Sequence, residues 1–177
     1  AASDVYKRQL LDTVEVGKSP FGLAINTNTN KIYVANSGSG SISVIDGLGN
    51  VLVETVEVGS VSGGIAVNSV SNKIYIANSG SNTVSVIDRP SNTVIATIPV
   101  GSGPAAVAVN TATNKIYIAN AGSNTVSVID SNKNSIVATV SVGNEPYGLA
   151  INPNTNRIDV TSFYSNSVYS IGGLIGT

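Results

Sequence analysis

The sequence predicts an all-β protein, folded as a β-propeller of four blades with four strands each. The main observation is an internal repeat whose copies begin at Asn30, Asn72, Asn114 and Asn156, a fixed spacing of 42 residues. A fixed period of this size indicates a repeat architecture. Each period holds four short runs rich in β-branched residues, separated by turn residues, and none has helical spacing. One run, KIYIAN at 73–78, is apolar on both faces, as strands in radially stacked sheets are.

The first run of each repeat is expected to form the outer strand of a blade. It reads QLLDTVEVG at 9–17, VLVETVEVG at 51–59, NTVIATIPVG at 92–101 and NSIVATVSVG at 134–143. Each copy ends at a Gly, which supplies the positive φ that a tight turn requires. The next run, FGLAIN in the first repeat, is expected to be innermost, because small residues suit the crowded centre of a radial assembly.

The other two strands of each repeat follow across short turns. An Asn-bounded turn precedes a strand that reads KIYVAN, KIYIAN or RIDVTS, and Asn tolerates the left-handed backbone of a hairpin loop. A loop rich in Ser and Gly leads to the last strand, which reads SISVID, TVSVID or SVYSIG. Four hairpin-type turns in 42 residues favour a propeller blade over a parallel β-helix, the competing repeat fold.

The order of the strands predicts how the ring closes. The chain opens with an outer strand and ends after a third strand, near Ile171. Residues 9–16 are therefore expected to complete the blade made by 147–171, which removes an exposed sheet edge. Two alternatives keep the same pairing: two chains form one eight-bladed ring, or each subunit donates its outer strand to the next.

The first eight residues lie outside the repeat. The string SDVYKRQ resembles translated adapter sequence at the ends of metagenomic reading frames, so the extension 1–8 is either native or an artefact. The expected domain is 9–177, as a four-bladed propeller or as half of an eight-bladed ring.

The strand motifs resemble a known family. KIYVAN and KIYIAN, with the VID ending and the VG-x-x-P turn, are similar to the YVTN-repeat β-propeller family over essentially 9–177, although Ala35, Ala77 and Ala119 stand where its name-giving Thr would be. The resemblance implies cell-surface and secreted proteins, often surface-layer components, mostly without known enzymatic activity. It brings no catalytic residues with it.

The composition argues against most chemistry. The chain has no His and no Cys, the residues that zinc and nucleophilic sites usually recruit. Charged residues make up 11% with a formal net charge of −1, so nucleic acid is not an expected partner. Asp46, Asp88 and Asp130 recur once per blade, and turn capping is favoured over a ring of cation ligands. We expect no enzyme activity, catalytic residue, metal or cofactor, and no membrane insertion.

The fourth repeat departs from the others, and its changes suggest a contact. Phe163 and Tyr164 replace Ser-Gly in a loop on the same face as the turns that carry Phe21 and Tyr147. If the ring closes, these aromatics meet at the seam between the first and last blades, where they either only pack that seam or form an exposed subunit contact. The leading hypothesis is a non-enzymatic extracellular or cell-surface scaffold that assembles with copies of itself into a surface layer, filament or tube. The alternative is a binding module that recognises a protein, glycan or small ligand.

Overall fold

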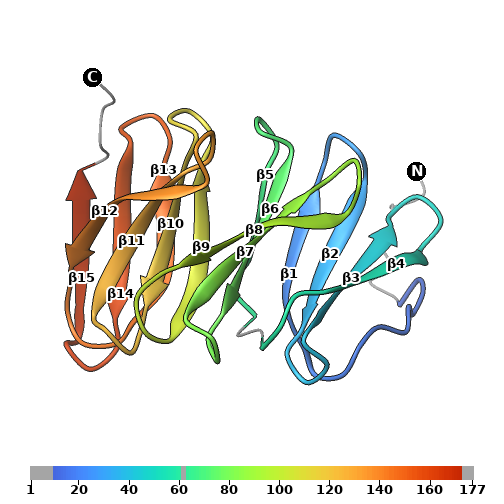
Figure 1. Cartoon of the computed structure of the whole chain (residues 1–177), viewed down its shortest axis with the longest axis horizontal. Helices are drawn as coiled ribbons and strands as arrows, with labels where there is room; N and C mark the ends of the chain where they lie inside the picture. The colour runs from blue at the N-terminus through green and yellow to red at the C-terminus, as the bar shows by residue number, and fades with distance from the viewer. Residues whose placement is uncertain (1–9, 61–62, 173–177) are drawn as a thin grey trace, which may run out of the picture.

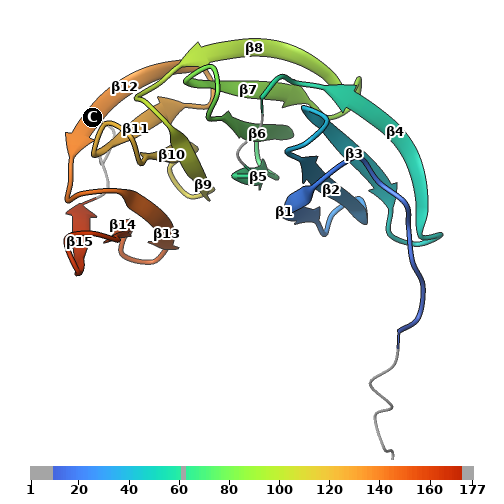
Figure 2. The same ribbon diagram turned by 90° about the horizontal axis from the view of Figure 1, so that it is seen from below.

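The computed structural model describes residues 10–60 and 63–172 as an array of antiparallel sheets. The described residues form fifteen strands and no helix, in three four-stranded sheets and one three-stranded sheet. The sheets fan out along an arc, with β1, β5, β9 and β13 on the inside and β4, β8 and β12 on the outside (Figures 1 and 2). No helix in this part of the chain has the length and apolarity to cross a membrane.

Each sheet corresponds to one blade of the predicted propeller. Blade 1 holds β1 (Pro20–Asn26), β2 (Lys31–Asn36), β3 (Ser41–Asp46) and β4 (Val51–Glu57). Blade 2 holds β5 (Ile65–Asn68), β6 (Lys73–Asn78), β7 (Thr83–Asp88) and β8 (Thr93–Pro99). Blade 3 holds β9 (Pro104–Asn110), β10 (Lys115–Asn120), β11 (Thr125–Asp130) and β12 (Ser135–Ser141). Blade 4 holds β13 (Pro146–Asn152), β14 (Arg157–Ser162) and β15 (Ser167–Gly172).

The hairpin turns adopt the backbone that their Asn residues predict. The last residue of each turn between the first two strands of a blade has a positive φ, at Asn30 (51°), Asn72 (60°), Asn114 (53°) and Asn156 (52°). Asn is the non-Gly residue best suited to this left-handed region, because its short side chain bonds the nearby backbone. The repeated Asn residues therefore fix the position of the turns, and with them the strand register.

The hydrophobic core is divided among three seams between neighbouring blades. In the first seam Tyr33, Ala35, Ile42, Val44 and Val56 of blade 1 meet Ile74, Ile76 and Ile87 of blade 2. Most of the same positions, 42 and 84 residues further on, build the second and third seams. A strand such as KIYIAN thus places Tyr75 in one seam and Ile76 in another, which is why it is apolar on both faces.

The tyrosines at the seams differ in their hydrogen bonds. The Tyr75 hydroxyl lies 2.7 Å from the Ser131 Oγ of the next blade. The Tyr117 hydroxyl is equally buried, but it has no hydrogen-bond partner among the described residues. Burial raises the pKa of both tyrosines.

This difference predicts opposite outcomes for one chemical change. Tyr75→Phe is expected to cost about 1 kcal/mol of unfolding free energy, because it removes a buried hydrogen bond. Tyr117→Phe is expected to be neutral or stabilising by up to about 1 kcal/mol, because it removes a buried hydroxyl without a partner. Urea denaturation of both variants measures the two values. Equal losses would show that the two hydroxyls have equivalent surroundings.

The structure does not show the predicted closure of the ring within one chain. Residues 10–16 form no strand, and within 10–60 and 63–172 the sheet of blade 4 contains only β13, β14 and β15. In Figure 2 the blades cover only part of a circle, and residues 10–16 run out beyond β4, away from blade 4. Side-chain packing at the three seams sets the angles between neighbouring blades, and three such steps do not bring blade 4 back to blade 1 (Figure 2). The extension 1–8 lies outside the described residues.

Candidate functional site

The aromatic residues predicted to form a contact are all on the surface. Phe21 lies in β1, Tyr147 in β13, and Phe163 and Tyr164 in the loop between β14 and β15, and each is more than half exposed. The Phe163 and Tyr164 rings meet edge to face, with their centroids 5.0 Å apart. Glu145, Tyr147 and Phe163 line a surface hollow of about 260 Å³. Three of the four residues therefore belong to blade 4.

Phe21 does not join this group within one chain. It lies in blade 1, where it packs against the turn before β5, so close that a Cβ at Gly63 would be 2.3 Å from its Cδ1. The expected meeting of all four aromatics depended on ring closure, which the structure does not show. Phe21 and Gly63 occupy equivalent positions in blades 1 and 2. Their contact shows that this position of one blade touches the same position of the next blade at the first seam.

The recurring aspartates act at turns. The Asp130 carboxylate accepts hydrogen bonds from the backbone N–H groups of Asn132 and Lys133, and the Lys115 ammonium, 2.7 Å away, holds its pKa below the ordinary value. Asp88 accepts bonds from the backbone and hydroxyl of Ser91. These contacts confirm the turn-capping interpretation for Asp88 and Asp130, whereas Asp46 pairs with Lys31. Among residues 10–60 and 63–172, no group of three or more acidic side chains is arranged to hold a metal ion.

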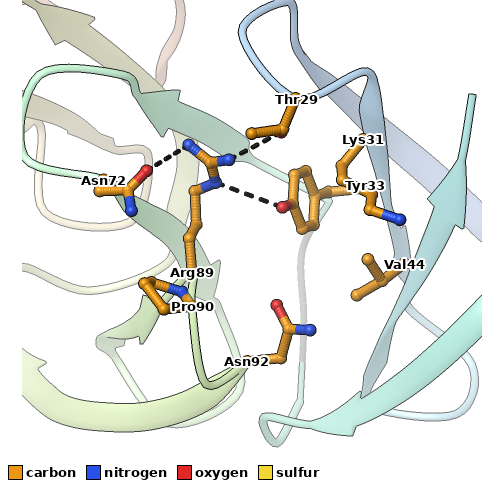
Figure 3. A pocket seen from close by; sticks show the side chains of 8 residues that line it. All are labelled: Thr29, Lys31, Tyr33, Val44, Asn72, Arg89, Pro90 and Asn92. Atoms are coloured by element: carbon orange, nitrogen blue, oxygen red, sulfur yellow. Dashed lines mark hydrogen bonds between the residues drawn. The ribbon is translucent and has the colours of Figure 1, made fainter.

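A pocket that the sequence did not predict lies between blades 1 and 2. It has a volume of about 270 Å³ and is lined by Thr29, Lys31, Tyr33, Val44, Asn72, Arg89, Pro90 and Asn92 (Figure 3). The Arg89 guanidinium donates hydrogen bonds to Tyr33 Oη (3.3 Å), Asn72 Oδ1 (2.5 Å) and Thr29 Oγ1 (2.7 Å). The side chain is only 9% exposed. Arg89 therefore joins the two blades from a buried position.

The lysine at this position bonds differently at the first and second seams. At the next seam Lys73 crosses to blade 3 and donates to the Ser131 carbonyl and to Asn134 Oδ1, 2.9 Å away. The corresponding Lys31 instead pairs with Asp46 of its own blade at 3.2 Å. Lys31 and Asn92 both line the pocket at the first seam, whereas at the second seam Lys73 bonds Asn134, the residue equivalent to Asn92.

The two ends of the blade array are chemically different. The open face of blade 1 carries Leu23 and Ile25, which are 59% and 56% exposed, and whose counterparts in other blades pack into seams. The open face of blade 4 is more polar, because Asp159 replaces the repeated Tyr and is bonded to Arg157 and Ser170. The Ser170 hydroxyl, followed by Arg157, lowers the pKa of Asp159. This face also has a hollow of about 220 Å³, lined by Gly148, Leu149, Ala150, Asp159, Thr161 and Val168.

The strand order and the repeated seams define a propeller-like all-β repeat protein. The family model of the Choice-of-anchor I domain matches residues 2–162, and the chain belongs to this family. Membership indicates a role and a location related to the cell surface. The YVTN-repeat family, which the motifs resemble, is not the family that matches. No curated protein matches the chain.

Solved structures share the fold at low sequence identity. Hydrazine synthase of Kuenenia stuttgartiensis aligns with a TM-score of 0.83 and 21% identity, over 90% of this chain and 47% of that one. A functionally unknown protein from Desulfotomaculum acetoxidans aligns with a TM-score of 0.75 and 16% identity, over 89% of this chain and 56% of that one. The chain thus spans about half the length of these neighbours, and at such identities the likeness concerns the fold alone.

Proposed function

We propose that the chain is a non-enzymatic structural module of the cell surface that assembles with copies of itself. One observation carries the proposal: among the described residues, blade 4 has no outer strand, while residues 10–16 have the sequence of an outer strand and pair with no sheet. Their segment QLLDTVEVG corresponds to VLVETVEVG, whose first seven residues form β4. Leu10 and Leu11 are 84% and 86% exposed, as an unpaired apolar segment would be.

The repeat specifies how the two ends would pair. In blade 1, Ile42 of β3 lies opposite Val56 of β4. The equivalent residues are Val168 in β15 and Val14 in the N-terminal segment. We apply the β3–β4 register to β15 of one copy and the N-terminal segment of another copy. The resulting pairs are Ser167–Glu15, Val168–Val14 and Ser170–Asp12.

This pairing also brings the open faces and the aromatics together. It places blade 4 of one copy beside blade 1 of the next, so that Leu23 and Ile25 face the hollow on blade 4. At the first seam Phe21 packs against Gly63, which is the same position one blade later. By that rule Tyr147 of one copy would contact Phe21 of the next. The aromatic contact expected within one ring would then form between copies.

A cysteine pair tests the proposed register. We expect Val14→Cys with Val168→Cys to form disulfides between copies, since residues opposite one another in an antiparallel pair have Cα atoms about 4.5–5.5 Å apart. The chain has no Cys of its own, so each single variant is a clean control. Non-reducing gel electrophoresis, together with sedimentation of the wild type, gives the readout.

The outcomes separate the alternatives. Cross-linked dimers or a ladder support assembly between copies. A cross-linked monomer would show that the ring closes within one chain and would contradict assembly through this strand. Absence of a cross-link, with a wild type that is monomeric at high concentration, would overturn the proposal as a whole.

A further inference from the structure

Arg89 is a buried cation that has no anionic partner in the part of the chain that the structure describes. The ion pairs among the described residues are Lys31–Asp46, Lys115–Asp130 and Arg157–Asp159. The acceptors that Arg89 reaches are a phenol, an amide and a hydroxyl, all uncharged. A guanidinium has five N–H groups, and three are used here, so two remain for another acceptor. A buried charge is usually paired, because burial without an opposite charge is costly.

Holding the two blades together does not require an arginine. At the second seam Ser131 occupies the position of Arg89, and its hydroxyl bonds Tyr75 Oη at 2.7 Å. A neutral serine therefore supplies the same bridge to the tyrosine of the preceding blade. The first seam therefore carries a positive charge that the second seam does not need at this position. The pocket lies at the same seam.

The other groups of the pocket suit an organic anion. Figure 3 shows the Arg89 guanidinium between Asn72 on one side and Thr29 and Tyr33 on the other, with Lys31, which pairs with Asp46, beyond Tyr33. The Asn72 amide nitrogen is a further donor, since its oxygen already accepts a bond from Arg89. Val44 and Pro90 provide apolar walls, which a fully hydrated inorganic anion would not use. Glu54 is the carboxylate bonded to the pocket residue Asn92, and it is exposed to solvent.

We propose that the pocket between blades 1 and 2 binds a small carboxylate, with the Arg89 guanidinium as its main partner. A planar carboxylate matches the fork of N–H donors that a guanidinium presents. The pocket volume of about 270 Å³ lies near the lower end for ligand sites, so it suits a single small acid or one acidic sugar. A free small acid and a uronic-acid unit of a glycan both present a carboxylate, and the proposal concerns that group. This binding is independent of assembly.

Calorimetric titration tests the site with defined probes. We expect glucuronate and acetate to bind the wild type, and neutral glucose not to bind. Arg89→Ser reproduces the residue of blade 3 and is expected to weaken glucuronate binding at least about tenfold. Arg157→Ser removes an exposed arginine on blade 4 and is the matched control, with unchanged binding expected. Arg89→Lys keeps the positive charge but loses the planar pair of N–H donors. This variant is also expected to bind glucuronate clearly more weakly than the wild type.

Each outcome bears on the proposal. Binding of a short oligogalacturonate as well as glucuronate assigns the site to a glycan, and binding of the monomer alone assigns it to a free acid. Equal affinity of wild type and Arg89→Lys, or of glucose and glucuronate, would overturn the carboxylate assignment. Tighter binding of inorganic phosphate than of glucuronate would overturn it as well. Absence of binding by every probe would leave Arg89 as a structural link between blades.

Discussion

Replacing Gly64 by Ala is expected to destabilise the protein by about 2 kcal/mol or more, within the range for overpacking. A Cβ at this position would lie 2.5 Å from the backbone oxygen of Ala105 and 3.1 Å from the Cα of Ala106. Both atoms belong to β9, which pairs with β10 on both sides of an irregularity at Ala105. Backbone held in a ladder cannot move aside as the end of a flexible side chain can. The methyl group would therefore push blades 2 and 3 apart near the inner edge of the array.

A second glycine provides the matched control. A Cβ at Gly172 would meet no heavy atom within 4 Å. Gly172→Ala is expected to leave the unfolding free energy unchanged or slightly raised, because Ala restricts the unfolded chain more than Gly does. Neither glycine has a positive φ, so the comparison isolates crowding from backbone strain. Thermal or urea unfolding measures both variants, and similar stabilities for the two would show that blades 2 and 3 do not pack this closely.

The contacts within a blade could be predicted from the sequence because they are local. The predicted strands KIYIAN and TVSVID coincide with β6 and β7, which are neighbours joined by a short turn. Positive φ at Asn72 and the small residue at Gly64 follow from the same repeat pattern. Each of these features depends on a few adjacent residues, so the pattern of apolar and turn residues is sufficient.

Closure and the pocket depend on packing between blades, which the pattern does not encode. The angle at a seam results from how side chains such as Tyr33 and Ile74 fit together, and small differences add up along the arc. Lys31 and Lys73 stand in nearly the same local sequence, yet one bonds its own blade and the other crosses to the next. One feature of the sequence could have indicated the pocket. Arg89 follows the repeated Asp at a position where the neighbouring repeats have Gly47 and Ser131.

Introducing a negative charge on the open face of blade 1 is expected to abolish assembly. Ile25 is 56% exposed, while its counterparts Val67, Val109 and Ile151 pack into the three seams. If blade 4 of a second copy covers this face, Ile25→Glu would bury an additional carboxylate at the contact, which costs several kcal/mol. In the separate chain the same residue faces solvent, so folding should change by no more than about 0.5 kcal/mol.

The sign of the charge at position 25 provides a further test. At the first seam Val67 packs against the cluster that contains Tyr33, and the corresponding residue of blade 4 is Asp159. Glu at position 25 would lie near that carboxylate, whereas Ile25→Lys would place an ammonium there and should weaken assembly less. Val70→Glu, in an exposed loop position, is the control that should leave assembly intact. Sedimentation across a concentration series gives the order of the three variants. Equal assembly of Ile25→Glu and wild type would show that this face is not a contact between copies.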